Sequence, residues 1–189
     1  MKHTTILFLI LTSITLNAQN TYQLSGHITS VYDDPIGDVT IIATNTQDNT
    51  SITTTASCDD GTYLLEDLEE GIEYELALLK EGSAYNGIST FDLVLISKHI
   101  LDVEPLDSYR FYGADINASG QITVQDLVML RLVVVNIWDD FPGNNWHFFA
   151  EGTDVPAETF NVMLTSDVND FNFIAVKKGD VNSSAQGCE

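Results

Sequence analysis

The chain has 189 residues, of which 28 are acidic and 7 are Lys or Arg, and its net charge is −21. Such a chain lacks the basic surface that a nucleic-acid backbone requires, and its charge also disfavours docking on an anionic membrane. Because 44% of the residues are apolar and 10% are aromatic, the composition favours packed cores over disorder, and the length fits one or two domains.

Residues 1–19 have the pattern of a secretory signal peptide, with Lys2, the apolar run Ile6–Leu16 and the small residue Ala18. We predict cleavage after Ala18 or Gln19, and an uncleaved N-terminal anchor is the alternative. The apolar run is about 11 residues long, shorter than the ~20 of a membrane-spanning helix. No later segment is long enough to span a bilayer. The predicted location is therefore secreted, extracellular or at the cell surface.

The sequence contains two cysteines, Cys58 and Cys188. Export would permit a disulfide between them, and such a bond would tie the C-terminal tail to the N-terminal half. Sequence does not show that the two Cα atoms approach closely enough for a bridge. Free or partner-linked thiols are the alternative.

Residues 22–79 show the period of short, half-buried strands. Apolar residues alternate with polar ones, and turn-forming clusters such as Asp33–Gly37 and Asp59–Gly61 separate the runs. Strands at this spacing are typical of a β-sandwich. The alternating apolar positions are Leu24, Ile28, Val39, Ile41, Ala43, Ile52, Tyr63, Leu65, Tyr74, Leu76 and Leu78.

Four short motifs mark these strands: SG-x-I at the end of the first, a Pro-x-Gly-x-Val turn, an Asp-Gly-Thr-Tyr strand, and a closing Gly-x-x-Tyr-x-Leu strand. With them, the segment resembles the carboxypeptidase regulatory-like (transthyretin-like) β-sandwich. The resemblance implies a spacer or stability module without catalytic residues. His27 has no second histidine nearby and is interpreted as an ordinary strand residue rather than a metal ligand.

Two later segments, Thr90–Leu101 and Val124–Val135, carry apolar residues at helical spacing. They are repeats, because the residues from Asp92 align with those from Asp126 at one constant offset. Both are apolar on nearly all sides, so we expect each helix to be covered on more than one side. The β-branched run Val133–Val135 is a poor helix former, and we expect the second helix to fray or end there.

The strongest chemical signal is the segment Asp115–Asp126, DINASGQITVQD. Oxygen-bearing side chains stand at its first, third, fifth, ninth and twelfth positions, and glycine stands at the sixth. Ca²⁺ takes roughly six to eight oxygen ligands, which this alternation would supply together with the carbonyl of the seventh residue. The candidate ligands are Asp115, Asn117, Ser119, Gln121, Thr123 and Asp126.

An Asx-rich turn that caps a helix without metal is the alternative interpretation of this segment. The twelfth residue is Asp126, whereas the common EF-hand has glutamate there. The shorter arm would loosen the coordination or admit Mg²⁺, which prefers six ligands at shorter range.

The first repeat lacks the opening half of such a loop. Asn86–Asp92 matches its last positions, but residues 82–85 offer almost no carboxylate, whereas Asp180–Ser184 in the tail has the oxygen pattern of the missing half. We hypothesise a calcium site split by circular permutation, because the termini of a domain are often close. The alternatives are a degenerate first loop without metal and a tail that binds nothing. The candidate ligands are Ser89, Asp92, Asp180, Asn182 and Ser184.

With these loops, Asn86–Leu101 and Asp115–Val135 resemble the type I dockerin fold, and Gly179–Asn182 is similar to the opening of a dockerin loop. The resemblance implies paired calcium-binding loop–helix motifs that dock on a cohesin-like partner through the tenth and eleventh loop residues. These residues differ between the two repeats, so docking should use one face. They are Thr90 and Phe91 in the first repeat and Val124 and Gln125 in the second.

Residues 137–178 are rich in aromatic side chains and predict two or three strands or extended segments. Two interpretations remain open: a core that covers the apolar helices, which is the commoner use of such residues, and an exposed sugar-binding platform. The residues concerned are Trp146, Phe148, Phe149, Phe160, Val162, Leu164, Phe171, Phe173 and Ile174.

The sequence contains no Ser-His-Asp order, histidine pair, phosphate loop or CxxC motif, and we expect no catalysis. The predicted fold class is α+β multidomain: a signal peptide at 1–19, a β-sandwich at 20–81, and a dockerin-like calcium-binding domain at 82–189 with an insertion at about 137–178. The expected function is a secreted, calcium-stabilised structural or adhesive surface protein, with polysaccharide as a candidate ligand. The alternative is a dockerin-type assembly module that docks on a cohesin-like protein.

Overall fold

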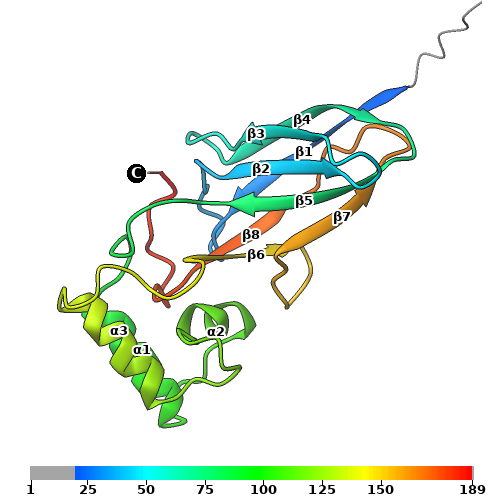
Figure 1. The fold of residues 1–189 in the computed structure, drawn as a ribbon. Helices are drawn as coiled ribbons and strands as arrows, with labels where there is room; N and C mark the ends of the chain where they lie inside the picture. The colour runs from blue at the N-terminus through cyan, green and yellow to red at the C-terminus, as the bar shows by residue number, and fades with distance from the viewer. Residues whose placement is uncertain (1–19, 189) are drawn as a thin grey trace, which may run out of the picture.

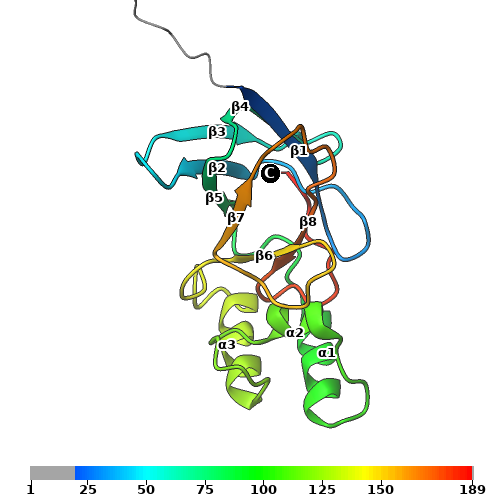
Figure 2. The same cartoon turned by 90° about the vertical axis from the view of Figure 1, so that its right-hand side faces the viewer.

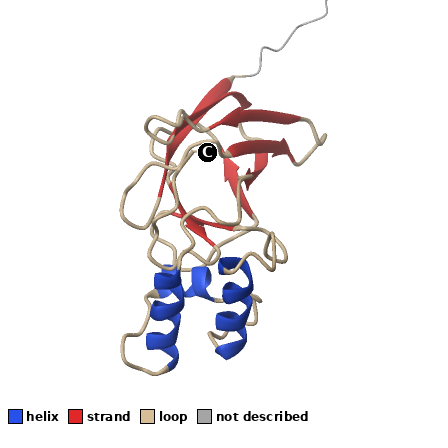
Figure 3. Ribbon diagram, turned by 90° about the vertical axis from the view of Figure 1, so that its left-hand side faces the viewer, coloured by secondary structure: helices blue, strands red, loops and turns tan. Residues whose placement is uncertain are grey.

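Two four-stranded sheets face each other in the computed structural model, which describes residues 20–188 (Figure 1). The predicted signal peptide lies outside the described residues. One sheet has the strand order β4-β1-β8-β6 and the other β3-β2-β5-β7. Three helices within residues 20–188 gather at one end of this sandwich-like pair (Figure 3). The elements are β1 (Thr21–Thr29), β2 (Thr40–Asn45), β3 (Ser51–Thr55), β4 (Thr62–Glu69), β5 (Glu73–Leu79), α1 (Thr90–Ile100), α2 (Ser108–Ala114), α3 (Val124–Val134), β6 (Trp146–Ala150), β7 (Thr159–Met163) and β8 (Phe173–Lys177).

The five N-terminal strands form where the alternation of apolar and polar residues predicts them. On β5, for example, Tyr74, Leu76 and Leu78 are buried in the sandwich core. Leu24 and Ile28 of β1 are buried in the same core. The α+β class and the sandwich-like packing of the sheets are thus confirmed.

The segment predicted as an insertion in the second domain completes both sheets instead. β8 runs parallel to β1, β6 pairs antiparallel with β8, and β7 pairs antiparallel with β5. The sandwich is therefore built from both ends of the described chain, and the helices are inserted between β5 and β6. The expected boundary after residue 81 does not separate the sheets, because strands that pair over such a distance leave no local sign of their partner.

Most of the aromatic side chains listed for this segment fill the sandwich core, whereas we expected them to cover the helices; Phe149 instead packs against Tyr109 and Tyr112 of α2. The ring centroid of Phe173 lies 4.8 Å from that of Phe160 and 5.3 Å from that of Phe171. Trp146 and Phe148 are only 6% and 5% exposed. They therefore present no open aromatic face on which a sugar ring could stack.

α1 and α3 lie side by side with nearly the predicted bounds (Figure 2). α3 ends at Val134, inside the β-branched run, as predicted. Leu95 and Ile96 of α1 pack with Leu130 and Val133 of α3 in a second hydrophobic core. This core also includes Val181 of the C-terminal tail.

The outer faces of the two helices are open to solvent, which corrects the expectation that each helix is covered on more than one side. Val94 is 47% exposed and Val128 is 51% exposed. Of the segment expected to cover them, Trp138 and Phe141 pack with the helical core, while most of its later aromatic residues lie in the sandwich.

α2 is not predicted by periodicity, because it is short and its sequence SYRFYGA carries no helical apolar repeat. Asp107 caps it: one carboxylate oxygen accepts the Arg110 N–H at 2.9 Å, and the other lies 2.7 Å from Arg110 Nε. At its other end, the Gly113 carbonyl accepts the Gly179 N–H at 2.8 Å. α2 thereby joins the helices to the residues that follow β8.

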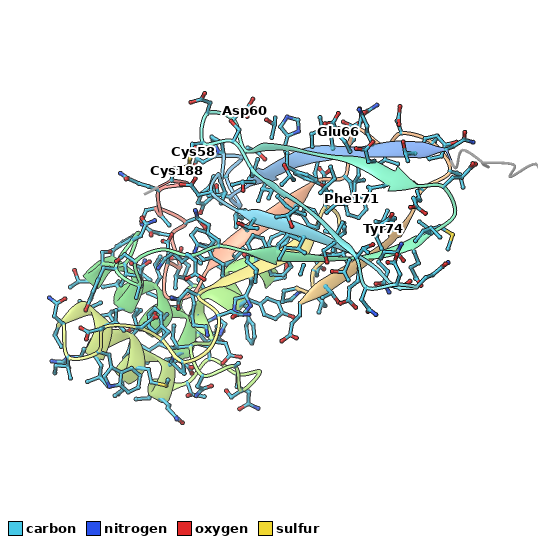
Figure 4. The ribbon with its side chains drawn as sticks, turned by 45° about the horizontal axis from the view of Figure 1, so that its top comes forward. Cys58, Asp60, Glu66, Tyr74, Phe171 and Cys188 are labelled. Carbon is cyan, nitrogen blue, oxygen red and sulfur yellow. A yellow bond between two sulfur atoms is a disulfide. The ribbon has the colours of Figure 1, made fainter. Side chains whose placement is uncertain are left out.

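Cys58 and Cys188 form a disulfide with their Cα atoms 5.8 Å apart, which ties the C-terminal tail to the loop between β3 and β4 (Figure 4). Disulfides of this kind are characteristic of proteins in oxidising, extracellular environments. Among residues 20–188, no helix has the length and apolar character needed to cross a membrane.

If β8 is part of the sandwich core, Phe173→Ala should lower the free energy of unfolding by about 3 kcal/mol or more, because a fully buried ring is lost. Urea denaturation measures the change. Met163→Ala on β7 is the matched control, since this side chain is 57% exposed and its loss should change stability by no more than about 0.5 kcal/mol. Equal effects of the two substitutions would contradict the packing described here.

Candidate metal centre

The predicted loop Asp115–Asp126, which we call the continuous loop, lies between α2 and α3. N–H groups of the following turn donate hydrogen bonds to its first carboxylate. Asp115 accepts the Ser119 N–H on Oδ1 at 2.9 Å and the Gly120 N–H on Oδ2 at 2.7 Å. Gly120 has φ +77°, a left-handed conformation that favours glycine. The chain therefore wraps around the Asp115 carboxylate.

The twelfth residue of the loop reaches back across it. Asp126 Oδ2 accepts the N–H and the hydroxyl of Thr123 at 2.8 and 3.0 Å, which forms the capping box of α3. Its other oxygen accepts the Asn117 N–H at 3.2 Å. Asp126 thus joins the start of α3 to the third position of the loop.

The remaining candidate oxygens lie between these two carboxylates. The Ser119 hydroxyl donates to the Gln121 carbonyl at 3.1 Å, and the Ser119 N–H donates to Asn117 Oδ1 at 2.9 Å. The first, third, fifth, seventh and twelfth positions therefore contribute oxygens to one cluster. The ninth residue, Thr123, takes part through the cap.

Residues 180–185 of the tail and residues 87–92 before and at the start of α1 together reproduce this arrangement, although they are far apart in the sequence. We call them the split loop. Asp180 accepts the Ser184 N–H on Oδ1 at 3.0 Å and the Ala185 N–H on Oδ2 at 2.7 Å. The Ser184 hydroxyl donates to the Gly87 carbonyl at 3.0 Å, as Ser119 does to the carbonyl of Gln121. The structure thus brings the two halves of the hypothesised split loop together.

Asp92 is the counterpart of Asp126. Its Oδ2 accepts the N–H and the hydroxyl of Ser89 at 2.8 and 2.9 Å, which forms the capping box of α1. Its Oδ1 accepts the N–H groups of Val181 and Asn182 at 2.9 and 3.2 Å. All five predicted residues of the split site therefore lie in one cluster.

The junction between the two halves was not found from sequence. Ala185, and not Asn86, makes the backbone contact of the sixth position, while the Asn86 side chain accepts from and donates to the backbone of Gln186, both at 2.9 Å. Gly87 has φ +73°, and a Cβ there would lie 2.5 Å from the Ala185 nitrogen and 2.7 Å from Asp180 Oδ2. Only glycine fits this crossing. No sequence signal marks this junction, because the groups that meet there, the Gly87 carbonyl and the Ala185 N–H, belong to the backbone.

The amide group of Asn182 lies among the oxygen atoms of the split site. One end of it lies 2.7 Å from Asp180 Oδ1, 3.1 Å from Asp92 Oδ1 and 2.9 Å from Ser184 Oγ. With nitrogen at this end, the amide donates to these oxygens. With oxygen there, four oxygens face one another, which is the arrangement that a bound cation stabilises.

Four carboxylates are buried in the two loops: Asp92 and Asp126 are 0% exposed, Asp180 is 1% and Asp115 is 6% exposed. Burial raises the pKa of Asp180; two backbone N–H groups lower it, the charge of Asp92 raises it further, and the charge of Lys177 lowers it. Buried carboxylates are costly unless hydrogen bonds or cations compensate their charge. A divalent cation in each loop would supply that compensation.

The candidate ligands of both clusters offer oxygen donors and no sulfur or imidazole, and such donor sets fit Ca²⁺ or Mg²⁺ better than softer metals. A separate group within the described residues contains Asp38, Cys58 and Cys188. Its two sulfur atoms are joined in the disulfide, so they are not thiolates that could coordinate a metal.

Two buried lysines next to the split site were also missed. Lys177 and Lys178 are each 3% exposed, and their ammonium groups donate to the carbonyls of Ala84 and Pro142, both at 2.8 Å. They anchor the end of β8 to the beginning and the end of the helical segment. Charged residues are rarely buried, so their sequence gives no indication of this role.

His99 and His147, the two histidines of the later half of the described chain, contact backbone or aromatic groups. His99 Nδ1 accepts the Leu106 N–H at 3.0 Å. His147 lies beside Tyr112, and burial, aided by the charge of Lys178 and opposed by that of Asp115, lowers the pKa of His147 to about 4. Neither arrangement includes a nucleophile that the histidine could activate.

Exposed apolar residues on α1 and α3, and in the turns that follow these helices, come in pairs related by the repeat. Val94 corresponds to Val128, Leu101 to Val135, and Val103 to Ile137, and all six are exposed. Phe91 and Val124 lie near the helix starts and are also exposed. We call these eight residues the helix surface.

Comparison with known protein families, with curated proteins and with solved structures finds no match for this chain.

The buried His147 predicts a pH dependence of stability. An unfolded histidine titrates near 6.5 and the folded one near 4, so the unfolded chain binds more protons between these values. Stability should therefore fall by up to about 3 kcal/mol as the pH is lowered from 6.5 to 4.

Urea denaturation at a series of pH values, without added calcium, tests this expectation. His147→Gln should flatten the slope between pH 6.5 and 5, whereas His27→Gln, at an exposed position on β1, should leave it unchanged. An unchanged slope in His147→Gln would contradict the assignment.

Proposed function

We propose that the protein is an extracellular, non-catalytic module whose helical half is stabilised by calcium bound in two loops, one continuous and one split. The observation that carries the proposal is the correspondence between the loops. In each, the first Asp accepts two N–H groups of the following turn, the fifth Ser donates to the carbonyl of the seventh residue, and the twelfth Asp caps a helix.

Calcium is favoured by the chemistry of these residues. Each loop offers oxygens from carboxylate, amide, hydroxyl and carbonyl groups, the mixture that calcium loops use. Asp92 and Asp126 lie in the first turns of α1 and α3, where the helix dipole favours negative charge. Because these aspartates have shorter side chains than the glutamate of the common EF-hand, Mg²⁺ is the ion that would compete with Ca²⁺.

A structural role follows from where the loops lie. Each loop includes the start of one helix, α1 or α3, and the split loop also includes the residues that follow β8. Calcium would therefore fix both helices to each other and to the sandwich. An extracellular location is supported by the disulfide and by the signal-like pattern of residues 1–19.

The second candidate function is a docking module for a protein partner, and the helix surface favours it. Exposed apolar residues that gather on one part of a protein are common at interaction sites. The resemblance to dockerins implies a cohesin-like partner that contacts Phe91 and Val124, both of which are exposed. The burial of Trp146 and Phe148 removes the feature that favoured polysaccharide.

Calorimetric titration of the chelated protein should show two calcium ions bound. Asp115→Asn should remove the continuous site and Asp180→Asn the split site, because each deletes a buried charge at a loop's first position. At a concentration of 100 times Kd, each ion should add about 2.7 kcal/mol to stability, which thermal melting follows.

Asp170→Asn, at an exposed position outside both loops, is the matched control and should leave both ions bound. Two ions in Asp180→Asn would refute the split site. No binding at millimolar calcium would refute the proposal as a whole, and tighter binding of Mg²⁺ would change the ion assigned.

For the second candidate, Val94→Asp combined with Val128→Asp should weaken binding to cohesin-type domains by about tenfold or more, because charge is placed in the apolar surface. Surface plasmon resonance with immobilised cohesins measures the change. Leu64→Asp, on exposed β4, is the control and should have no effect. Capture by polysaccharides but by no cohesin would count against docking and for an adhesive function.

A further inference from the structure

The C-terminal residues 179–188 form a strap that crosses from the helices to the sandwich (Figures 1 and 4). It begins at β8, where the Gly179 N–H donates to the Gly113 carbonyl of α2, and Val181 is buried in the helical core. It ends at the disulfide to Cys58 in the loop between β3 and β4. The strap is therefore attached to both halves of the molecule.

Between its ends, the strap carries the first half of the split loop. Its residues from Asp180 to Ser184 lie opposite Asp92 and the Gly87 carbonyl, where the two halves of the split loop meet. Toward its end, noncovalent contacts keep the strap in place: Ala185 packs against the sandwich core, and Gly187 lies close to the backbone of Pro35. Gln186 pairs with the Asn86 side chain, and the Gly187 carbonyl accepts from Lys80 Nζ at 2.9 Å.

The two loops differ in how their halves are connected. In the continuous loop, the backbone itself joins the first position to the twelfth within one short segment. In the split loop, the distance along the chain between Asp92 and Asn182 is 90 residues. The proximity of its halves depends on β8 at one end of the strap and on the disulfide at the other, and a tether raises the effective concentration of the group that it holds.

We propose that the Cys58–Cys188 disulfide is a redox control of calcium binding at the split loop. This inference rests on the proposed function, since it requires that the loop binds calcium. With the disulfide intact, Ser184 and Ala185 are held between two anchors. With the disulfide reduced, the strap beyond Asn182 is held only by noncovalent contacts. The split loop then loses conformational entropy when it binds the ion, which lowers its calcium affinity.

The chemistry is thiol–disulfide exchange with a dithiol. The dithiol gives two electrons and two protons, the Cys58–Cys188 bond breaks to two thiols, and the dithiol becomes a disulfide. Cys58 is exposed and Cys188 is partly exposed, so a dithiol can reach the bond. Because coupling between two sites is reciprocal, bound calcium should make the disulfide harder to reduce by the same factor.

The continuous loop is the internal control. The test is calorimetric calcium titration of the protein when oxidised, when reduced with dithiothreitol, and as the Cys58→Ser/Cys188→Ser variant. The Asp115→Asn background isolates the split loop and the Asp180→Asn background isolates the continuous one. Loss of the disulfide should weaken the split loop by about tenfold and the continuous loop by less than about twofold.

A second measurement does not depend on the cysteine variant. The fraction of reduced Cys58–Cys188 is measured in dithiothreitol buffers of fixed ratio, with and without calcium. Calcium should raise the dithiol excess needed for half reduction by about tenfold, and this effect should disappear in Asp180→Asn.

The outcomes are distinguishable. Equal calcium affinity in both redox states, or equal weakening of both loops, would overturn the redox control and leave calcium binding in place. Absence of calcium binding in the oxidised protein and in both backgrounds would overturn the proposed function itself.

Discussion

Asp92 joins two parts of the chain that are 89 positions apart, from Asp92 to Val181. One of its oxygens caps α1 through Ser89 and the other accepts N–H groups of the tail. Because this carboxylate is fully buried, the start of α1 and the path of the tail are determined together. The route by which Cys188 reaches Cys58 depends on the same contact. Asp126 makes the equivalent link within a single loop.

Local features of the sequence were sufficient to predict α1, α3 and the continuous loop. The spacing of Asp115 and Asp126 and the β-branched run after Leu132 act over a few residues, and the structure has the loop and the helix end where those patterns predict them. The split loop was also accessible, because Asp180–Ser184 repeats the spacing of Asp115–Ser119. Whether the loops bind calcium stays a prediction.

Other features depend on groups that leave no pattern in the sequence. The Gly87 carbonyl and the Ala185 N–H belong to the backbone, which every residue carries. Lys177 and Lys178 are buried because their ammonium groups reach carbonyls of distant residues, and sequence assigns lysine to the surface. The pairing of β8 with β1 likewise depends on strands from opposite ends of the described chain.

The parallel pairing of β1 with β8 has a consequence for the order in which the protein folds. Of the described strands, β1 is the first to leave the ribosome or an export channel, and β8 is the last. Until β8 arrives, β1 has an open edge, and open strand edges promote aggregation. Pairing over such a distance is also slow. The sandwich therefore closes only after β8 has emerged, and the Cys58–Cys188 bond can form only after Cys188, which follows β8 in the chain.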